Sequence, residues 1–376
     1  MNYSKLKKEK VCLVIERVDF FLSHRRDLYY FLSKNFDVSV ITDVSLCKNK
    51  DLLKDIKIFH LDARPSLRRL KDMLLHIKNL DNLIKISDPD HILFITLEKS
   101  LIGAILNICS KTKKNYFFIT GIGQNFFKKN FWSRLITIFA MTIFKLNALR
   151  NNSKFVFQNL GDEEYFQNIT KTKNNFIIKG SGIDRNTFIR KTSSYNLSIP
   201  VFLFCGRLEK AKGIFTLLDA LESLEMYENK FKMIFAGTIA EDDVLKKRLE
   251  LIFNKKNISY LGHIDFDQMQ EVYNQANILV LPSLGEGLPK VALEAMSMKM
   301  PLILSNIPGC EECIQNDLNG YLHDKSDHEE LAILMKKFIL DPNTIHKMGV
   351  ESENLYKRKF SNERIFADYI NLLKKN

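Results

Sequence analysis

The chain has 376 residues, of which 45% are hydrophobic and 27% charged, and its formal net charge is +12. This length exceeds that of one ordinary core, so we expect two domains, and the composition excludes a disordered or fibrous protein. The basic start "MNYSKLKKEK" lacks the apolar core of a signal peptide, and the longest apolar run, residues 135–144, is about half of a membrane span. We therefore expect a cytoplasmic protein. The isolated Cys310 and Cys313 are not expected to hold a metal or redox centre.

In the first half of the chain, short runs of β-branched and aromatic residues alternate with helical patterns. The predicted strands are "VCLVIERV", "DVSVIT", "HILFIT", "NYFFIT", "KFVFQN" and "NFIIKG". Helical patterns such as "RDLYYFLSKN" and "SLIGAILNICSKT" lie between them. Apolar strands that alternate with helices indicate a parallel sheet covered on both faces.

No Asp or Glu occurs from Lys99 to Gly161, whereas Lys and Arg recur throughout this span. In its middle, "NFFKKNFWSRLITIFAMTIFKL" interleaves Phe and Trp with basic residues. This pattern is typical of a basic amphipathic helix on an anionic lipid surface. Two alternatives stay open: a core helix with a basic solvent face, and a nucleic-acid surface, for which no motif is present.

After the polar segment "KTSSYNLSIP", residues 191–200, the alternation begins again with "VFLFC", "KMIFAG", "ISYLG", "ILVLPS" and "PLILS". Two such series predict an α/β protein of two doubly wound, Rossmann-like domains that face a cleft at the carboxyl ends of their strands. We expect the first domain at residues 1–192 and the second at residues 198–358. The last stretch, "SNERIFADYINLLKKN", predicts an amphipathic helix with Ser361 as its N-cap.

The loop "CGRLEKAKG", residues 205–213, follows the first strand of the second series. Arg207 and Lys212 lie on either side of the crossing from strand to helix. A cation at a helix N-terminus is disfavoured by about 0.3–1 kcal/mol unless an anion joins it. Two cations there are typical of a phosphate site, and two solvated basic side chains are the alternative.

The stretch "LPSLGEGLPKVALEAM", residues 281–296, repeats the order of strand, turn and helix. Pro289 is predicted to be the first helical residue, so that the backbone N–H groups of Gly287, Leu288 and Lys290 face the cleft. Glu294 lies among apolar neighbours, where an unpaired carboxylate is costly. It therefore needs a partner, which is either Lys290 at i,i+4 spacing or a ligand.

These two loops together resemble those of the retaining glycosyltransferases of family 4, which have the GT-B fold. Other segments fall in the order expected of that family: "FFLSHRRDLYYFL" (20–32), "TGIGQNFF" (120–127), "FVFQNLGDEEYF" (155–166), "GSGIDRNTF" (180–188), "YLGHIDFDQM" (260–269) and "PGCEECIQNDLNGYL" (308–322). The set is most similar to bacterial enzymes that build O-antigen, capsule or other surface polysaccharide on a lipid carrier. The resemblance also implies that the last helix, at about residues 360–376, crosses back to the first domain.

The resemblance implies a nucleotide-diphosphate sugar as donor. Arg207 and Lys212 would then hold the diphosphate, and Glu286 the hydroxyls of the transferred sugar. These three are the candidate catalytic residues. The ribose hydroxyls would bind Glu294, and the nucleobase would lie beside His263 and Ile264. The full candidate donor set is Gly206, Arg207, Lys212, His263, Ile264, Glu286, Gly287, Leu288, Pro289 and Glu294.

The acceptor implied by the resemblance is a polyprenyl-diphosphate-linked glycan at the inner face of the plasma membrane. Many family members carry a histidine after the fourth strand, where this chain has "ITLEKSLIG". The acceptor-side candidates are therefore His24 and Arg25, in a predicted loop after the first strand, with Gly121 and Gly123.

The resemblance also implies that the sugar keeps its anomeric configuration and that no metal or other cofactor is needed. The "DPD" of residues 88–90 precedes a strand and predicts a turn, although it looks like a metal-binding Asp-x-Asp. Two other functions stay open. One is a nucleotide-sugar 2-epimerase of the same fold, and the other is a basic membrane- or nucleic-acid-binding protein with a vestigial donor site.

Overall fold

The computed structural model describes residues 8–45, 47, 49–62, 70–109, 113–121, 131–172, 175–183, 188–191 and 199–374. The chain divides into two compact units. Unit 1 comprises Met1–Gly182 and Ile365–Asn376, and unit 2 comprises Ile183–Arg364. Within the described residues, no helix is long and apolar enough to cross a bilayer.

Unit 1 contains, within the described residues, a seven-stranded sheet in the order β3-β2-β1-β4-β5-β6-β7. All of its neighbouring strands are parallel. The strands are β1 (Lys10–Arg17), β2 (Asp37–Asp43), β3 (Ile58–His60), β4 (His91–Ile95), β5 (Lys114–Ile119), β6 (Ser153–Phe157) and β7 (Asn175–Ile177). The helices are α1 (Val18–His24), α2 (Arg26–Ser33), α3 (Leu70–Ser87), α4 (Leu97–Cys109), α5 (Phe131–Ala148) and α6 (Leu160–Thr170).

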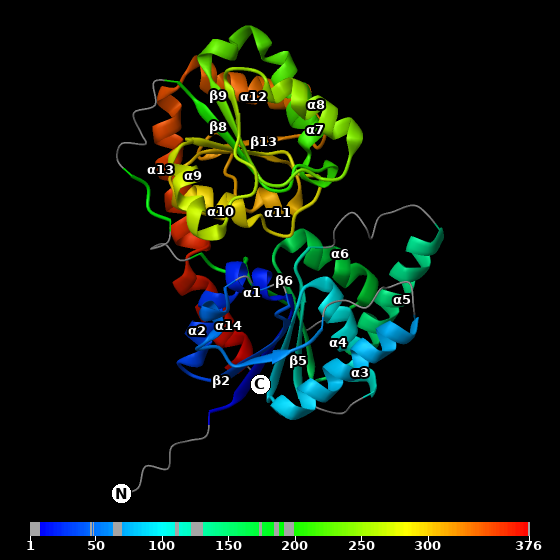
Figure 1. The fold of residues 1–376 in the computed structure, drawn as a ribbon. Helices are drawn as coiled ribbons and strands as arrows, with labels where there is room; N and C mark the ends of the chain where they lie inside the picture. Colours follow the sequence, from blue (N-terminus) through cyan, green and yellow to red (C-terminus); the bar gives the residue numbers. More distant parts are fainter. Residues whose placement is uncertain are drawn as a thin grey trace, which may run out of the picture. The chain divides into compact units, whose positions relative to one another are not determined.

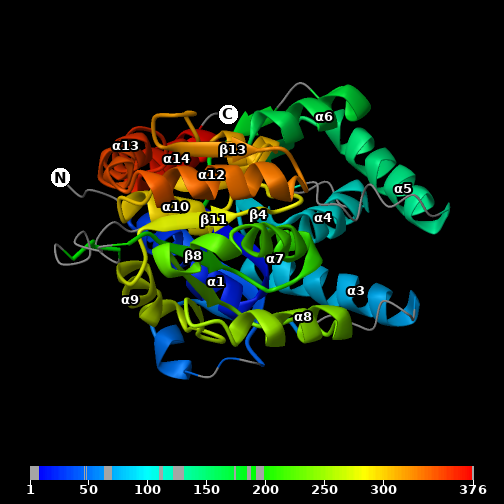
Figure 2. The same ribbon diagram turned by 90° about the horizontal axis from the view of Figure 1, so that it is seen from above.

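The central strand β1 supplies both faces of this sheet, because successive side chains of a strand point to opposite sides. Val11, Leu13 and Ile15 belong to one buried cluster, which includes side chains of α1 and α2. Cys12 and Val14 belong to the other, which includes side chains of α4, α5 and α6. The helices accordingly form two layers around the sheet (Figure 1). Both views show α5 at the rim of unit 1 (Figures 1 and 2).

The last helix of the chain, α14 (Asn362–Lys374), packs on unit 1. Its Phe366 contacts Phe31 of α2, with ring centroids 4.8 Å apart, and its Tyr369 stacks on Phe118 of β5 at 5.6 Å. The backbone N–H of Arg364 donates to Ser361 Oγ at 3.5 Å. The prediction that the final helix crosses back to the first domain is confirmed.

Unit 2 contains, within the described residues, a six-stranded sheet in the order β10-β9-β8-β11-β12-β13. Its neighbouring strands are also parallel. The strands are β8 (Val201–Cys205), β9 (Lys232–Ala236), β10 (Ile258–Tyr260), β11 (Ile278–Leu281), β12 (Leu302–Ser305) and β13 (Gly320–His323). The helices are α7 (Ile214–Ser223), α8 (Asp243–Phe253), α9 (Met269–Asn274), α10 (Lys290–Ser297), α11 (Pro308–Glu311), α12 (His328–Leu340) and α13 (Asn343–Lys359).

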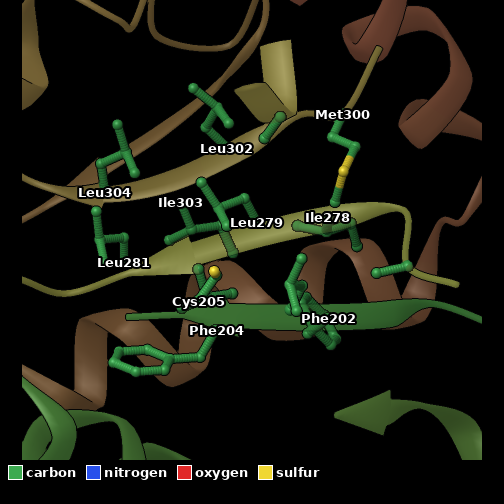
Figure 3. Packing of buried hydrophobic residues seen from close by; sticks show 14 of the residues in the cluster. Phe202, Phe204, Cys205, Ile278, Leu279, Leu281, Met300, Leu302, Ile303 and Leu304 are labelled. Atoms are coloured by element: carbon green, nitrogen blue, oxygen red, sulfur yellow. The ribbon is translucent and has the colours of Figure 1, made fainter. Parts of the chain in front are cut away.

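The core of unit 2 is built on three neighbouring strands, β8, β11 and β12. Figure 3 shows their side chains packed together, with Phe202, Phe204 and Cys205 on β8 next to Ile278, Leu279 and Leu281 on β11. Continuous apolar runs of this kind are typical of parallel strands that are covered on both faces. The core therefore holds the carboxyl ends of β8 and β11 in fixed positions.

Three local features differ from the sequence-based expectations. The edge strands β3 and β13 were not among the predicted strands, and both are short. The segment after β1, where a loop was expected, forms α1 at once from Val18. This helix is stabilised by the buried side chain of Phe21 and by Asp19 in its first turn.

Candidate functional site

The candidate donor residues lie in unit 2, where the strand order of the sheet reverses. In the order β10-β9-β8-β11-β12-β13, the chain moves outward in one direction from β8 and in the other from β11. Doubly wound sheets bind ligands outside the carboxyl ends of their strands at this switch point. The loops after β8 and β11 carry Arg207, Lys212 and Glu286, so their positions match this rule.

These two loops are joined directly to each other. The backbone N–H of Leu284 donates to Ala211 O at 2.9 Å. Lys212 Nζ donates to Glu286 Oε1 at 2.6 Å, and Ser283 Oγ donates to the same oxygen at 2.7 Å. The Lys212 and Glu286 side chains are 29% and 12% exposed. This geometry places a cation and a carboxylate side by side, each of them still partly open to a ligand.

Gly213 allows the two loops to approach this closely. Its φ of 69° lies in the left-handed region, and a Cβ there would collide with the carbonyl oxygen of Pro282. Gly213→Ala is therefore expected to destabilise the protein by at least about 2 kcal/mol, from left-handed strain plus the clash. Urea denaturation measures this loss.

Gly262 provides the matched control, because its φ is 70° and a Cβ there meets nothing within 4 Å. Gly262→Ala carries only the left-handed penalty of about 1–2 kcal/mol. Equal losses of stability in the two variants would contradict the proposed close approach of the loops.

Glu294, on α10, is held by two protein groups. Tyr273 OH donates to its Oε2 at 2.7 Å, and Lys290 Nζ lies 3.2 Å from its Oε1. The Glu294 side chain is 5% exposed and that of Lys290 14%. Lys290 also lies over the ring of Phe266, 4.2 Å from its centroid. The Lys290 pair matches the i,i+4 expectation, whereas nothing in the sequence pointed to Tyr273.

A buried thiol and phenol lie beneath this carboxylate. Burial, together with the charge of Glu294, raises the pKa of the Cys205 thiol to about 12. Burial and the same carboxylate raise the pKa of Tyr273 well above its usual value. Both groups therefore stay protonated near neutral pH, and Tyr273 acts as a hydrogen-bond donor to Glu294.

Arg207 and His263 lie at the exposed border of the site. Arg207 Nη2 forms an ion pair with Glu209 Oε1 at 2.8 Å, and its side chain is 70% exposed. His263 Nε2 lies 3.3 Å from Asp265 Oδ1. Ile264 packs on the core of unit 2. The strand ends behind them are adjacent, because Gly237 N donates to Gly262 O at 2.7 Å and Gly206 N donates to Ala236 O at 2.9 Å.

The turn before α10 differs slightly from the prediction. Pro289 is the N-cap and not the first helical residue, and α10 begins at Lys290. The carbonyl oxygen of Pro289 accepts a hydrogen bond from the backbone N–H of Ala292 at 3.0 Å. Leu288 is buried in the core, and Gly287 is the residue before it. The turn thus lies directly before the N-terminus of α10.

The acceptor-side candidates of unit 1 lie after two different strands, β1 and β5. His24 ends α1, where its ring stacks on Phe20 and its Nδ1 lies 2.7 Å from Ser23 Oγ. Arg25 is only 2% exposed, and within the described part of the chain its Nε has no hydrogen-bond partner. Because α1 replaces the predicted loop, both residues stand one short helix away from the end of β1. Gly121 follows β5 with a φ of 129°, and Gly123 lies outside the described residues.

A cavity of about 620 Å³ lies elsewhere, at the amino ends of β4 and β5. Its lining mixes charges of both signs: Glu9, Asp90, His91, Lys113, Lys114 and Arg150. Ligands of doubly wound sheets bind at the opposite edge. The cavity is therefore not the candidate donor site.

Two family models match most of the chain. The model described as "Glycosyl transferase 4-like" matches residues 10–159, and the model described as "Glycosyl transferases group 1" matches residues 185–355. The chain belongs to the glycosyltransferases. The sequence resemblance to this family is thereby confirmed.

Curated relatives of this glycosyltransferase include bacterial and archaeal proteins. It is 25% identical to an uncharacterized glycosyltransferase of Haemophilus influenzae, over 90% of this chain and 92% of the relative. It is 25% identical to the N,N'-diacetylbacillosaminyl-diphospho-undecaprenol alpha-1,3-N-acetylgalactosaminyltransferase of Campylobacter jejuni, over 70% of each. With the capsular polysaccharide biosynthesis glycosyltransferase CapM of Staphylococcus aureus it shares 24% identity, over 44% of this chain and 43% of CapM. Several of the curated matches span only about half of the relative's length.

Solved structures confirm the GT-B fold of the glycosyltransferase. A sucrose-phosphate synthase from Thermosynechococcus elongatus has a TM-score of 0.81 at 16% identity, over 98% of this chain and 99% of the other. HepE of Anabaena, solved with UDP and glucose, has a TM-score of 0.78 at 15% identity, over 98% and 100%. At these identities the likeness concerns the fold.

Proposed function

We propose that this glycosyltransferase moves a sugar from a nucleotide diphosphate to a polyprenyl-diphosphate-linked glycan during the synthesis of surface polysaccharide. The observation that carries the proposal is the pair of lysine–carboxylate contacts at the switch point of unit 2. Lys212 with Glu286 and Lys290 with Glu294 combine cations for phosphate with carboxylates for hydroxyl groups. A nucleotide sugar presents both kinds of group, namely phosphates and hydroxyls.

The donor is bound through the groups that these loops present. Arg207 and Lys212 bind the diphosphate, and Glu294 accepts hydrogen bonds from the ribose hydroxyls while Tyr273 holds its carboxylate in place. Glu286 accepts from hydroxyls of the transferred sugar, beside the amides of Gly287 and Leu288. The segment of His263 and Ile264 borders the nucleobase.

The transfer proceeds with retention of configuration. The glycosidic carbon passes through an oxocarbenium-like state, and the acceptor hydroxyl attacks from the face that the nucleotide leaves. Its proton passes to the departing phosphate. Negative charge then develops on the departing diphosphate, where Lys212 and Arg207 stabilise it electrostatically. We propose that the reaction needs no metal or other cofactor.

The acceptor and the location are the second part of the proposal. The Campylobacter relative is named for a diphospho-undecaprenol substrate and the Staphylococcus relative for capsular polysaccharide. A lipid-linked acceptor brings the enzyme to the inner face of the plasma membrane, as a peripherally bound protein. The net charge of +12 supports attraction to anionic lipid. His24, Arg25, Gly121 and Gly123 remain the proposed acceptor-side residues.

A thermal-shift measurement with UDP, GDP, dTDP and their sugars tests the donor site. A ligand that binds only the folded protein raises its stability by about 2.7 kcal/mol at a hundredfold excess over Kd. We expect a clear shift with one nucleotide family. The shift should be strongly reduced in Arg207→Ala, whose exposed side chain has little structural role.

Two outcomes would contradict the proposal. No shift with any nucleotide, in a well-folded sample, would remove the donor site. Conversion of the nucleotide sugar to its 2-epimer without any acceptor would identify an epimerase of the same fold instead. Transfer to a polyprenyl-diphosphate-linked glycan, followed by NMR of the new linkage, tests acceptor and retention together.

A further inference from the structure

The outer side of α5 in unit 1 is apolar and exposed. Exposed fractions between 43% and 80% are found for side chains on α5 and directly after it: Leu135, Ile136, Ile138, Phe139, Leu146 and Leu149. On the opposite side of the helix, Ala140, Met141 and Phe144 are buried in the core. The helix therefore has an inner face that is buried in the core and an outer face that is apolar and exposed. We call the exposed residues named above the α5 outer face.

The α5 outer face forms one continuous stripe. Its residues recur at the spacings of three and four that place side chains on one side of a helix. Thr142 is the polar residue within the stripe, and its Oγ1 donates to Ile138 O at 2.8 Å. Because that hydrogen bond is made inside the helix, the hydroxyl does not need water, and the stripe is apolar in effect.

Basic side chains accompany this stripe near both ends of α5. Arg134 is exposed near the N-terminus of α5, Lys145 is exposed near its C-terminus, and Arg150 follows shortly after. No Asp or Glu occurs from residue 99 to residue 161 of the sequence. An exposed apolar stripe between cations is the surface that an anionic lipid interface binds, through apolar burial and charge attraction together.

We infer that the α5 outer face inserts into the interface of a bilayer that contains anionic phospholipids. The helix lies in the plane of the interface, since no helix of the described residues could span a bilayer. A second copy of the chain fits this surface poorly, because pairing two α5 helices would bring Arg134 and Lys145 of both copies together without a carboxylate on either. This inference rests on the proposed function, because membrane binding would bring the enzyme to its lipid-linked acceptor.

Fluorescence of the full-length protein with lipid vesicles tests this inference. Trp132, the single tryptophan of the chain, lies within the first turn of α5 and reports on this helix alone. With phosphatidylglycerol–phosphatidylcholine vesicles, we expect a blue shift of its emission and quenching by lipids brominated on their acyl chains. With phosphatidylcholine alone, we expect at least tenfold weaker binding.

A double variant, Ile136→Ser with Phe139→Ser, is expected to weaken binding to the anionic vesicles at least tenfold. The matched control is Val244→Ser with Leu251→Ser on α8 of unit 2, which should bind as the wild type does. Both of these side chains are at least as exposed as those of Ile136 and Phe139. The thermal shift with the donor nucleotide should be unchanged in both, because none of the four substituted residues belongs to the candidate donor set. Failure of the donor proposal is thereby distinguished from failure of this one.

Three results would overturn the inference. They are an absence of vesicle binding, binding that the α5 double variant does not weaken, and binding without quenching of Trp132. A concentration-dependent dimer that the same double variant dissociates, measured by light scattering, would assign the α5 outer face to a second copy of the chain.

Discussion

Lys212→Ala is expected to lower the rate of sugar transfer by about 10²–10³-fold, the usual effect of removing one group that stabilises transition-state charge. Lys212 stands before α7 and is fixed by its 2.6 Å bond to Glu286, so its charge is in place before the donor arrives. The rate is measured with saturating donor and acceptor. Binding of the nucleotide should weaken less than turnover falls, because the charge on the diphosphate grows as the sugar leaves.

Lys210→Ala is the control for this prediction. Lys210 belongs to the same short turn, residues Lys210–Lys212, but its side chain is exposed. The Lys210→Ala variant should therefore retain near-normal turnover. Turnover of Lys212→Ala close to that of Lys210→Ala would remove the role of Lys212 in the reaction. Unfolding curves of both variants show whether a lower turnover comes from the lost charge or from a loss of folded structure.

The second large effect is expected at Glu294. Glu294→Ala removes the acceptor of both Tyr273 OH and Lys290, and Lys290 is only 14% exposed. Breaking a buried ion pair by deleting one partner costs about 3–5 kcal/mol. We therefore expect a loss of stability of that size in urea denaturation. An effect below about 1 kcal/mol would show that Glu294 is not buried with its partners in this way.

Glu294→Gln separates the binding role of this residue from its structural role. The amide keeps the shape and can still accept from Tyr273, so the loss of stability should be smaller than in Glu294→Ala. If Glu294 binds the ribose, the substitution weakens binding of the nucleotide diphosphate. The penalty should nearly vanish for the 2′,3′-dideoxy analogue, as a double-mutant cycle requires for a direct contact. An equal penalty with both nucleotides would place Glu294 away from the ribose.

Much of the fold could be predicted from the chain itself. Strands such as "VFLFC" and "ILVLPS" are apolar throughout because both of their faces are buried, and that pattern survives in the linear sequence. The alternation with helices then requires parallel sheets, whose loops emerge at the same edge. Arg207, Lys212 and Glu286 were proposed because they lie in loops that follow such strands, and Glu294 because it lies among apolar neighbours in the next helix.

The edge strands and the helix after β1 were less predictable. β3 and β13 are three and four residues long and lie at the borders of their sheets. A short strand with one neighbour carries little periodicity of its own. For "VDFFLSH", the burial of Phe21 against the sheet favours a helix where local signals suggested a loop.

Only the tertiary structure decided which side chains of the site meet over long distances in the sequence. Lys212 meets Glu286 across 74 residues, and Tyr273 meets Glu294 across 21. No local pattern encodes such contacts, because they arise when separate strands of one sheet bring their following segments together. The same holds for α5, where the sequence predicted an amphipathic helix with a basic face. Packing of Ala140, Met141 and Phe144 into the core decided that its outer face is apolar and its cations lie at the ends.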